Sequence, residues 1–139
     1  MDLQLKNKTA LVTGSTAGIG LAIAQALVRE GASVIVNGRT QPRVDEAVKK
    51  SGAAHGIAAD LGTEGGVAKV IAQFPAVDIL VNNLGIFEPK PFDQITDDDW
   101  RHFFEVNVLS GVRLSRHYIG KRIRDSIRKY QFPWHEIGI

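Results

Sequence analysis

The chain has 139 residues, which is long enough for one domain with a buried core, since domains of this size bury about 70% of the surface that the unfolded chain exposes. It contains no cysteine, which excludes disulfides and thiolate metal sites, and its four scattered histidines form no zinc pattern. Its apolar runs are too short to cross a membrane, and residues 1–9 lack the apolar core of a secretory signal. These features predict a single soluble, cytoplasmic domain that binds no metal.

The net charge of +2 hides an uneven distribution along the chain. Residues 1–120 carry 12 Lys and Arg against 13 Asp and Glu, whereas residues 121–139 carry five against two. A basic protein can bind nucleic acid, but here the basic excess is confined to one terminal segment and no recognition motif accompanies it. We therefore expect no nucleic-acid partner.

Short apolar, β-branched runs alternate with amphipathic stretches over the first 81 residues. The strand-like runs are residues 9–13, 33–36, 53–59 and 77–81. The helical stretches are residues 19–27, with Ile19, Ile23, Ala26 and Leu27 on one side and Gly31 just past the end, then 41–50 and 64–74. This order predicts an α/β fold, a truncated Rossmann-type doubly wound parallel sheet with strand order 3-2-1-4. A ligand crevice is then expected between the carboxyl ends of strands 1 and 4.

A long final helix is predicted from Thr96, which forms a capping-box-like pair with Asp99 at the start of an acidic first turn. An apolar stripe follows at helical spacing: Trp100, Phe103, Phe104, Val108, Gly111, Leu114, Ser115 and Tyr118. Asn107 falls on this stripe. From the residues alone we interpret Asn107 as a hydrogen-bonded polar group within the core.

A glycine-rich stretch, TGSTAGIG at residues 13–20, lies between the first predicted strand and the first helix. Glycines let backbone N–H groups approach a diphosphate, and a helix N-terminus favours the anion. The alternative is a tight turn without a ligand. A P-loop is excluded because Ile19 and Gly20 stand where its Lys-Ser/Thr pair is required.

Several motifs together resemble the short-chain dehydrogenase/reductase family. Residues 13–20 are similar to its TGxxxGxG signature, and residues 81–85, VNNLG, resemble its NNAG with Leu84 in place of alanine. Residues 59–61, ADL, resemble its acidic pair after strand 3, and residues 103–112, FFEVNVLSGV, its asparagine-bearing helix. The resemblance covers residues 6–118. It implies an oxidoreductase that transfers hydride between a nicotinamide and a small-molecule carbonyl or alcohol substrate.

The predicted coenzyme contacts follow strand ends. An acidic residue after strand 2 would bind the ribose 2′-hydroxyl of NAD, whereas Arg39 can pair with the 2′-phosphate of NADP. We therefore expect NADP rather than NAD. The alternative is that Arg39 is only a solvated charge in the loop. The resemblance assigns Asp60 to the adenine, although Asp60 could instead cap the next helix. It assigns Asn83 to the adenosine ribose, and we interpret Asn82 as the structural amide that bonds backbone across strands. The full predicted set is Gly14, Ser15, Thr16, Ala17, Gly18, Ile19, Gly20, Asn37, Arg39, Asp60, Leu61, Asn83 and Gly85.

Of the catalytic residues, the resemblance identifies Asn107, whose family counterpart binds a water linked to the catalytic lysine. The family's serine belongs on a fifth strand and its Tyr-x-x-x-Lys pair on the helix after it, and neither is present in the sequence. Tyr118 and Tyr130 lack a lysine at the required spacing, so we expect neither to be catalytic. This chain is therefore predicted to be catalytically incomplete.

Near Ile119 the sequence departs from the family pattern. We expect an incomplete nucleotide-binding domain over residues 1–119 and a divergent basic tail over residues 120–139. A frameshift or truncation would produce such a tail. The alternative is that the tail is a genuine basic helix of the protein. Strand 4 then becomes an open edge and the last helix loses apolar partners, which favours homo-oligomers and low stability. The alternative function is a non-catalytic NADP-binding or interaction module.

Overall fold

The computed structural model describes the backbone of residues 3–129 and the side chains of residues 3–120. Its four strands form one parallel sheet in the order β3-β2-β1-β4, as the sequence predicts. The strands are β1 (Thr9–Val12), β2 (Ser33–Gly38), β3 (His55–Ala58) and β4 (Ile79–Val81). Leu11 at the centre of β1 pairs with Ile35 of β2 and Leu80 of β4. The chain therefore crosses over in one direction from β1 and then in the other, the topology in which a crevice between β1 and β4 is expected.

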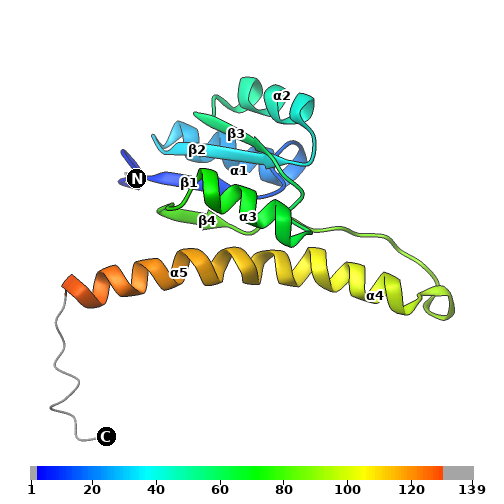
Figure 1. The fold of residues 1–139 in the computed structure, drawn as a ribbon. Helices are drawn as coiled ribbons and strands as arrows, with labels where there is room; N and C mark the ends of the chain where they lie inside the picture. The colour runs from blue at the N-terminus through cyan, green and yellow to red at the C-terminus, as the bar shows by residue number, and fades with distance from the viewer. Residues whose placement is uncertain (1–2, 130–139) are drawn as a thin grey trace, which may run out of the picture.

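Helices cover both faces of this sheet (Figure 1). They are α1 (Gly18–Arg29), α2 (Gln41–Ser51), α3 (Glu64–Gln73), a 3-10 turn (Phe92–Gln94), α4 (Asp97–Phe104), a π-helical segment (Glu105–Leu109) and α5 (Ser110–Lys129). Gly31, predicted to end α1, has a φ of +87° and donates its N–H to the Val28 carbonyl at 2.9 Å. The acidic first turn of α4 is closed by the predicted capping box between Thr96 and Asp99.

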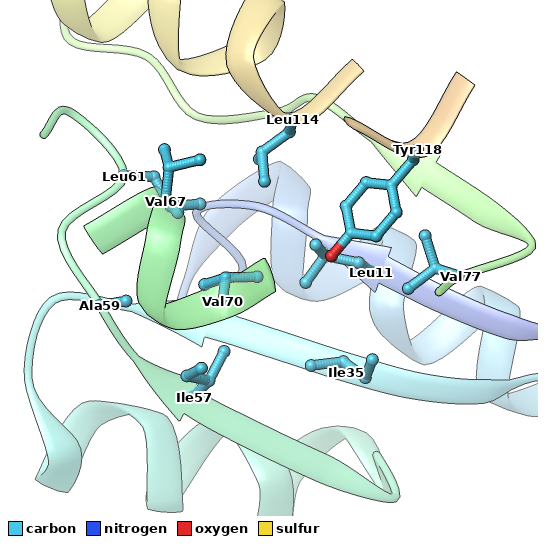
Figure 2. Packing of buried hydrophobic residues seen from close by; sticks show 10 residues of the cluster. All are labelled: Leu11, Ile35, Ile57, Ala59, Leu61, Val67, Val70, Val77, Leu114 and Tyr118. Atoms are coloured by element: carbon cyan, nitrogen blue, oxygen red, sulfur yellow. The ribbon is translucent and has the colours of Figure 1, made fainter. Parts of the chain in front are cut away.

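Alternation along the strands explains why both faces are apolar. Leu11 and Ile35 point to the side of α3 and α5, where Leu114 and Tyr118 complete the core (Figure 2). Their neighbours in the strands point to the other side and pack under α1 and α2: Ala10, Val12, Val34 and Val36. Because successive residues of a strand face opposite sides, a sheet buried on both faces requires the near-continuous apolar runs seen in the sequence.

The predicted apolar stripe of the last helix is only partly correct. The buried side chains on this helix recur every four residues, at Val106, Ser110, Leu114 and Tyr118. Three members of the predicted stripe are instead largely exposed: Trp100, Phe104 and Val108, with 56%, 54% and 43% of their surface accessible. The π-helical segment Glu105–Leu109 accommodates an extra residue within the helix. Because of this extra residue, the apolar side chains of α4 are rotated away from the face that α5 buries.

Within residues 3–129, β4 is the last strand on one side of the sheet. Next to it, α4, the π-helical segment and α5 carry large apolar side chains that are exposed at four-residue and seven-residue spacing: Phe104, Val108, Val112 and Ile119. Among residues 3–129, no helix combines the length and the hydropathy that crossing a membrane requires.

Candidate functional site

The glycine loop lies where the sequence places it, between β1 and α1 at the carboxyl edge of the sheet (Figure 1). Gly14 has a φ of +58°, a conformation that residues with a side chain rarely adopt. Gly20, in the first turn of α1, has no room for a Cβ atom, which would overlap the Asn83 side-chain amide, the Gly14 carbonyl and the Ser15 backbone. The loop therefore folds back onto the start of α1 in a way that requires glycine.

The N-terminus of α1 has no side-chain cap and no acidic residue in its first turn. The first backbone hydrogen bond of this helix runs from the Leu21 N–H to the Ala17 carbonyl, at 3.2 Å. Within residues 3–129, the N–H groups of Gly18, Ile19 and Gly20 have no acceptor. Three free donors at the positive end of a helix dipole are suited to bind a phosphate group. By contrast, side-chain oxygens of Thr63 and Thr96 cap α3 and α4.

Buried hydrogen bonds hold the base of this loop. The Ser15 hydroxyl donates to the Val12 carbonyl at 2.7 Å and accepts from the Asn37 N–H at 2.9 Å. The Asn37 side chain accepts from the Gly14 N–H at 3.2 Å and donates to the carbonyls of Ile57 and Ala59 at 3.2 and 3.1 Å. Because both amide hydrogens of Asn37 are used within the protein, its side chain supports the loop. A direct contact with coenzyme remains a prediction.

Of the two asparagines after β4, Asn83 and not Asn82 bonds to backbone across the strands. The Asn83 side chain donates to the carbonyls of Thr13 and Gly14, each at 3.0 Å, and so joins β4 to the glycine loop. The Asn82 side chain instead donates to the Ser115 hydroxyl on α5 at 3.1 Å. The interpretation of Asn82 as the amide that bonds backbone across strands is therefore wrong, since Asn83 does so. Because the two asparagines are adjacent and of the same type, the sequence does not indicate which of them faces β1.

Thr13 is a structural residue that the candidate set omitted. Its hydroxyl donates to the Val81 carbonyl at 3.2 Å and accepts from the N–H groups of Asn83 and Leu84, both at 2.9 Å. It thus fixes the turn that leaves β4 against the loop that leaves β1. Its position as the first residue of the glycine-rich stretch, directly after a buried strand, is the feature of the sequence that could have identified it.

Replacement of Asn83 by aspartate should lower the free energy of unfolding by about 3 kcal/mol, because the carboxylate faces two carbonyl oxygens and leaves both without a donor. Asn82→Asp is the matched control, with an expected loss below about 1 kcal/mol, since the Ser115 hydroxyl can donate to a carboxylate. Denaturant unfolding of both variants measures the difference. Equal losses would contradict the assignment of Asn83 as the link between β4 and the loop.

The predicted adenosine contacts lie at the carboxyl ends of β2 and β3. Arg39 directly follows β2 and is exposed. Asp60 is also exposed, and its carboxylate accepts from the Gly62 N–H at 3.0 Å. The alternative that Asp60 caps the next helix is wrong, because Thr63 is the residue whose side chain caps α3. Leu61 buries its side chain in the core.

Asn107 lies in the π-helical segment and is exposed, so its interpretation as a core group is wrong. Its side-chain oxygen accepts from the Ile86 N–H at 2.7 Å, and its amide donates to the Ile86 carbonyl at 3.1 Å. A Cβ atom on Gly85 would lie 3.2 Å from the same oxygen. Asn107 therefore holds the segment after β4 against the last helix, and the unusual helical geometry places it at the surface.

Tyr118 lies away from these residues. Its ring packs beside Val77, before the start of β4, and its hydroxyl donates to the Phe74 carbonyl at 2.7 Å (Figure 2). Burial raises the pKa of this hydroxyl. Tyr118 thus lies at the opposite end of β4 from Asn83, and its lack of a catalytic role remains a prediction. Tyr130 lies outside the described residues.

The comparison with family models decides the lineage: residues 8–126 match the short chain dehydrogenase model. The chain belongs to the short chain dehydrogenase family. The match extends past Ile119, where a departure from the family pattern was expected, and α5 likewise continues to Lys129. The division into residues 1–119 and 120–139 remains a prediction.

Curated members of this family include close relatives of the chain. It is 52% identical over 129 residues to the uncharacterized oxidoreductase YvaG of Bacillus subtilis, covering 88% of this chain and 49% of the relative. It is 39% identical over 124 residues to the NADP-dependent (R)-specific alcohol dehydrogenase of Lentilactobacillus kefiri, covering 82% of this chain and 49% of that enzyme. The chain thus spans about half the length of these relatives.

A solved structure shows the same fold at recognisable sequence identity. L-sorbose reductase from Gluconobacter frateurii, crystallised with NADPH and L-sorbose, superimposes with a TM-score of 0.77 and 35% identity. The match covers 86% of this chain and 49% of the reductase. Members of the short chain dehydrogenase family bind a nicotinamide coenzyme and act on small molecules.

Proposed function

We propose that this chain forms the NADP(H)-binding part of an oxidoreductase that interconverts a small-molecule carbonyl compound and its alcohol. The observation that carries the proposal is the uncapped N-terminus of α1, where three backbone N–H groups, including that of a glycine that admits no side chain, lack acceptors among residues 3–129. This arrangement fits a diphosphate in both charge and space. The bound coenzyme would supply the hydride, and the residues of the chain would hold and orient it.

A preference for NADP over NAD rests on the exposed cation after β2. Arg39 can form charge-assisted hydrogen bonds with a ribose 2′-phosphate. Arg43, in the first turn of α2, is also exposed, and the Thr40 side chain does not cap this helix. The chain has no carboxylate at residues 37–40 that would repel the phosphate. The names of the Lentilactobacillus enzyme and of the NADPH-bound reductase support the same coenzyme.

The remaining contacts follow from the geometry of the strand ends. We assign the Asp60 carboxylate and the Leu61 backbone to the adenine. The Asn83 amide nitrogen is occupied within the protein, but its side-chain oxygen has no partner among residues 3–129, so it can accept from a ribose hydroxyl. Gly85 would line the nicotinamide side, and Asn107 would keep Ile86 in place beside it.

We further propose that the 139 residues bind coenzyme without carrying out proton transfer, because Tyr118, the tyrosine on α5, bonds to a backbone carbonyl at the far end of β4. The oxidoreductase names of the relatives favour this lineage over the alternative of an interaction module.

We also propose that copies of the chain associate through the exposed apolar side chains of the last helix. Sedimentation equilibrium would measure that association, and a strictly monomeric chain would refute it.

Titration of the purified chain with coenzyme tests the main proposal. NADPH fluorescence should rise on binding and saturate, whereas NADH should bind at least about tenfold more weakly, because only NADPH carries the phosphate that Arg39 can bind. Competition by NADP⁺ should displace bound NADPH. Absence of saturable binding by either nucleotide would refute coenzyme recognition, and equal affinities would refute the assigned preference.

A further inference from the structure

The last helix changes its hydrogen-bonding pattern at the π-helical segment Glu105–Leu109. The Ser110 N–H donates to the Glu105 carbonyl, five residues earlier, whereas an α-helix would use the Val106 carbonyl, four residues earlier. The buried Ser110 hydroxyl donates to the Val106 carbonyl instead, at 2.6 Å. A side chain thus takes part in a backbone geometry that is rare in proteins and that occurs frequently at functional sites.

An ion pair spans this segment on one side of the helix. The Arg113 guanidinium donates to the Glu105 carboxylate at 2.7 Å, and the two residues are eight apart in the sequence. In an α-helix, which has about 3.6 residues per turn, side chains eight apart diverge by roughly 80° around the axis. The extra residue in the π-helical segment makes up this difference and brings Arg113 onto the same face as Glu105. The ion pair therefore depends on the π-helical geometry and stabilises it in turn.

The same arginine contacts a second carboxylate on a neighbouring helix. Its Nη2 atom lies 3.4 Å from the carboxylate of Glu64, in the first turn of α3, which packs beside α5 (Figure 1). The Glu64 side chain is 86% exposed, so water screens this pair, whereas the Arg113 and Glu105 side chains are 16% and 41% exposed. Pairing with Glu105 is also the main cause of the raised pKa of Arg113. Glu105 is therefore the principal partner of Arg113.

The side of the helix opposite this ion pair carries Asn107. Two residues correspond to roughly 200° around a helix, so the Asn107 side chain points away from Glu105 and toward the segment after β4. There it holds both backbone polar groups of Ile86, at 2.7 and 3.1 Å. A rotation of the π-helical segment about its axis would break these two hydrogen bonds. An interaction that fixes Glu105 therefore also fixes Asn107 against Ile86.

We propose that Arg113 is a positioning residue, which holds the π-helical segment through Glu105 and so keeps Asn107 bonded to Ile86 on the nicotinamide side. The inference rests on the proposed function, which it deepens by assigning the residue that keeps this side of the coenzyme site in place. Arg113 itself faces α3 and does not contact the coenzyme. Its effect should therefore appear at Ile86 first and in coenzyme binding as a consequence.

The two carboxylate partners of Arg113 give matched variants, Glu105→Gln and Glu64→Gln, each of which removes one negative charge and keeps the shape of the side chain. Amide hydrogen exchange in the 139-residue chain, followed by NMR, reports on the hydrogen bond that the Ile86 N–H donates to Asn107. We expect Glu105→Gln to speed the exchange of this amide about tenfold and Glu64→Gln to leave it unchanged, while the amides of β1 and β2 keep their rates in both variants. Equal effects of the two substitutions at Ile86, or an equal acceleration at β1 and β2, would overturn the proposal.

Arg113→Met tests the same ion pair from its other side. It should speed the exchange of the Ile86 amide as much as Glu105→Gln does, and the double variant should add nothing, because both substitutions remove one shared interaction. Additive effects would mean that Arg113 acts on Ile86 by another route, which contradicts the proposed role.

Coenzyme titrations of the same variants connect the ion pair to the proposed function. NADPH carries a nicotinamide, whereas adenosine 2′,5′-bisphosphate carries only the adenosine end. Glu105→Gln should weaken NADPH binding about fivefold and leave the bisphosphate unchanged, because only the nicotinamide side moves. Equal weakening of both ligands, or of neither, would refute a positioning role toward the coenzyme. Absence of NADPH binding by the unsubstituted chain refutes the coenzyme proposal instead, and the exchange of the Ile86 amide then still decides whether Arg113 acts through Glu105.

Discussion

Replacement of Gly20 by alanine is expected to lower the free energy of unfolding by about 3 kcal/mol and to abolish NADPH binding. The added Cβ would overlap the Asn83 amide, the Gly14 carbonyl and the Ser15 backbone. Two of these neighbours are main chain and cannot rotate away, so the loop must move off the start of α1. Because the same movement displaces the N–H groups assigned to the diphosphate, stability and coenzyme binding should fall together.

Gly65→Ala is the matched control for this prediction. Gly65 also lies in the first turn of a helix, α3, but a Cβ added there meets no atom within 4 Å. Alanine should therefore raise stability by up to about 1 kcal/mol through its higher helix propensity, with coenzyme affinity unchanged. Denaturant unfolding and NADPH fluorescence measure both variants. A Gly20→Ala chain as stable as Gly65→Ala would show that the loop is not packed against α1 as described.

The strand and helix order could be predicted because the physical causes are local. Short runs such as residues 34–36 are apolar on consecutive residues, as strands buried on both faces require, and Gly31 marks the end of α1 through its left-handed backbone. The crossovers then follow from the handedness of parallel connections. Ile19 shows the limit of this reasoning. It fits the apolar periodicity of α1, yet it is 76% exposed.

The errors at Asn82 and Asn107 have a different origin. They depend on where the chain turns after β4 and on a π-helical segment, and neither feature has a periodic signal in the sequence. Since adjacent residues at a strand end point in opposite directions, a small change in that turn decides which of two adjacent asparagines bonds to the backbone of the neighbouring loop. The extra residue in the helix likewise moves Asn107 from the expected buried stripe to the surface, where it bonds to Ile86.

Arg39→Asp is expected to raise the dissociation constant for NADPH about 100-fold while leaving NADH binding unchanged or slightly tighter. Charge-assisted hydrogen bonds of this kind are worth roughly 1.5–3 kcal/mol, and a factor of ten in affinity corresponds to about 1.4 kcal/mol. A carboxylate at this position would also repel the 2′-phosphate and could accept a hydrogen bond from the 2′-hydroxyl of NADH. The preference between the two coenzymes should therefore reverse, as parallel fluorescence titrations would show.

Lys49→Asp supplies the control for net charge, because Lys49 is also exposed but lies in the last turn of α2, at the other end of the helix from Arg39. It changes the charge of the chain by the same amount, so any general loss of attraction for a polyanion should appear equally in both variants. A specific site requires that only Arg39→Asp changes the ratio of the NADPH and NADH affinities. If both substitutions weaken NADPH to the same extent, Arg39 is a solvated loop charge and the preference must be set elsewhere on the edge of the sheet.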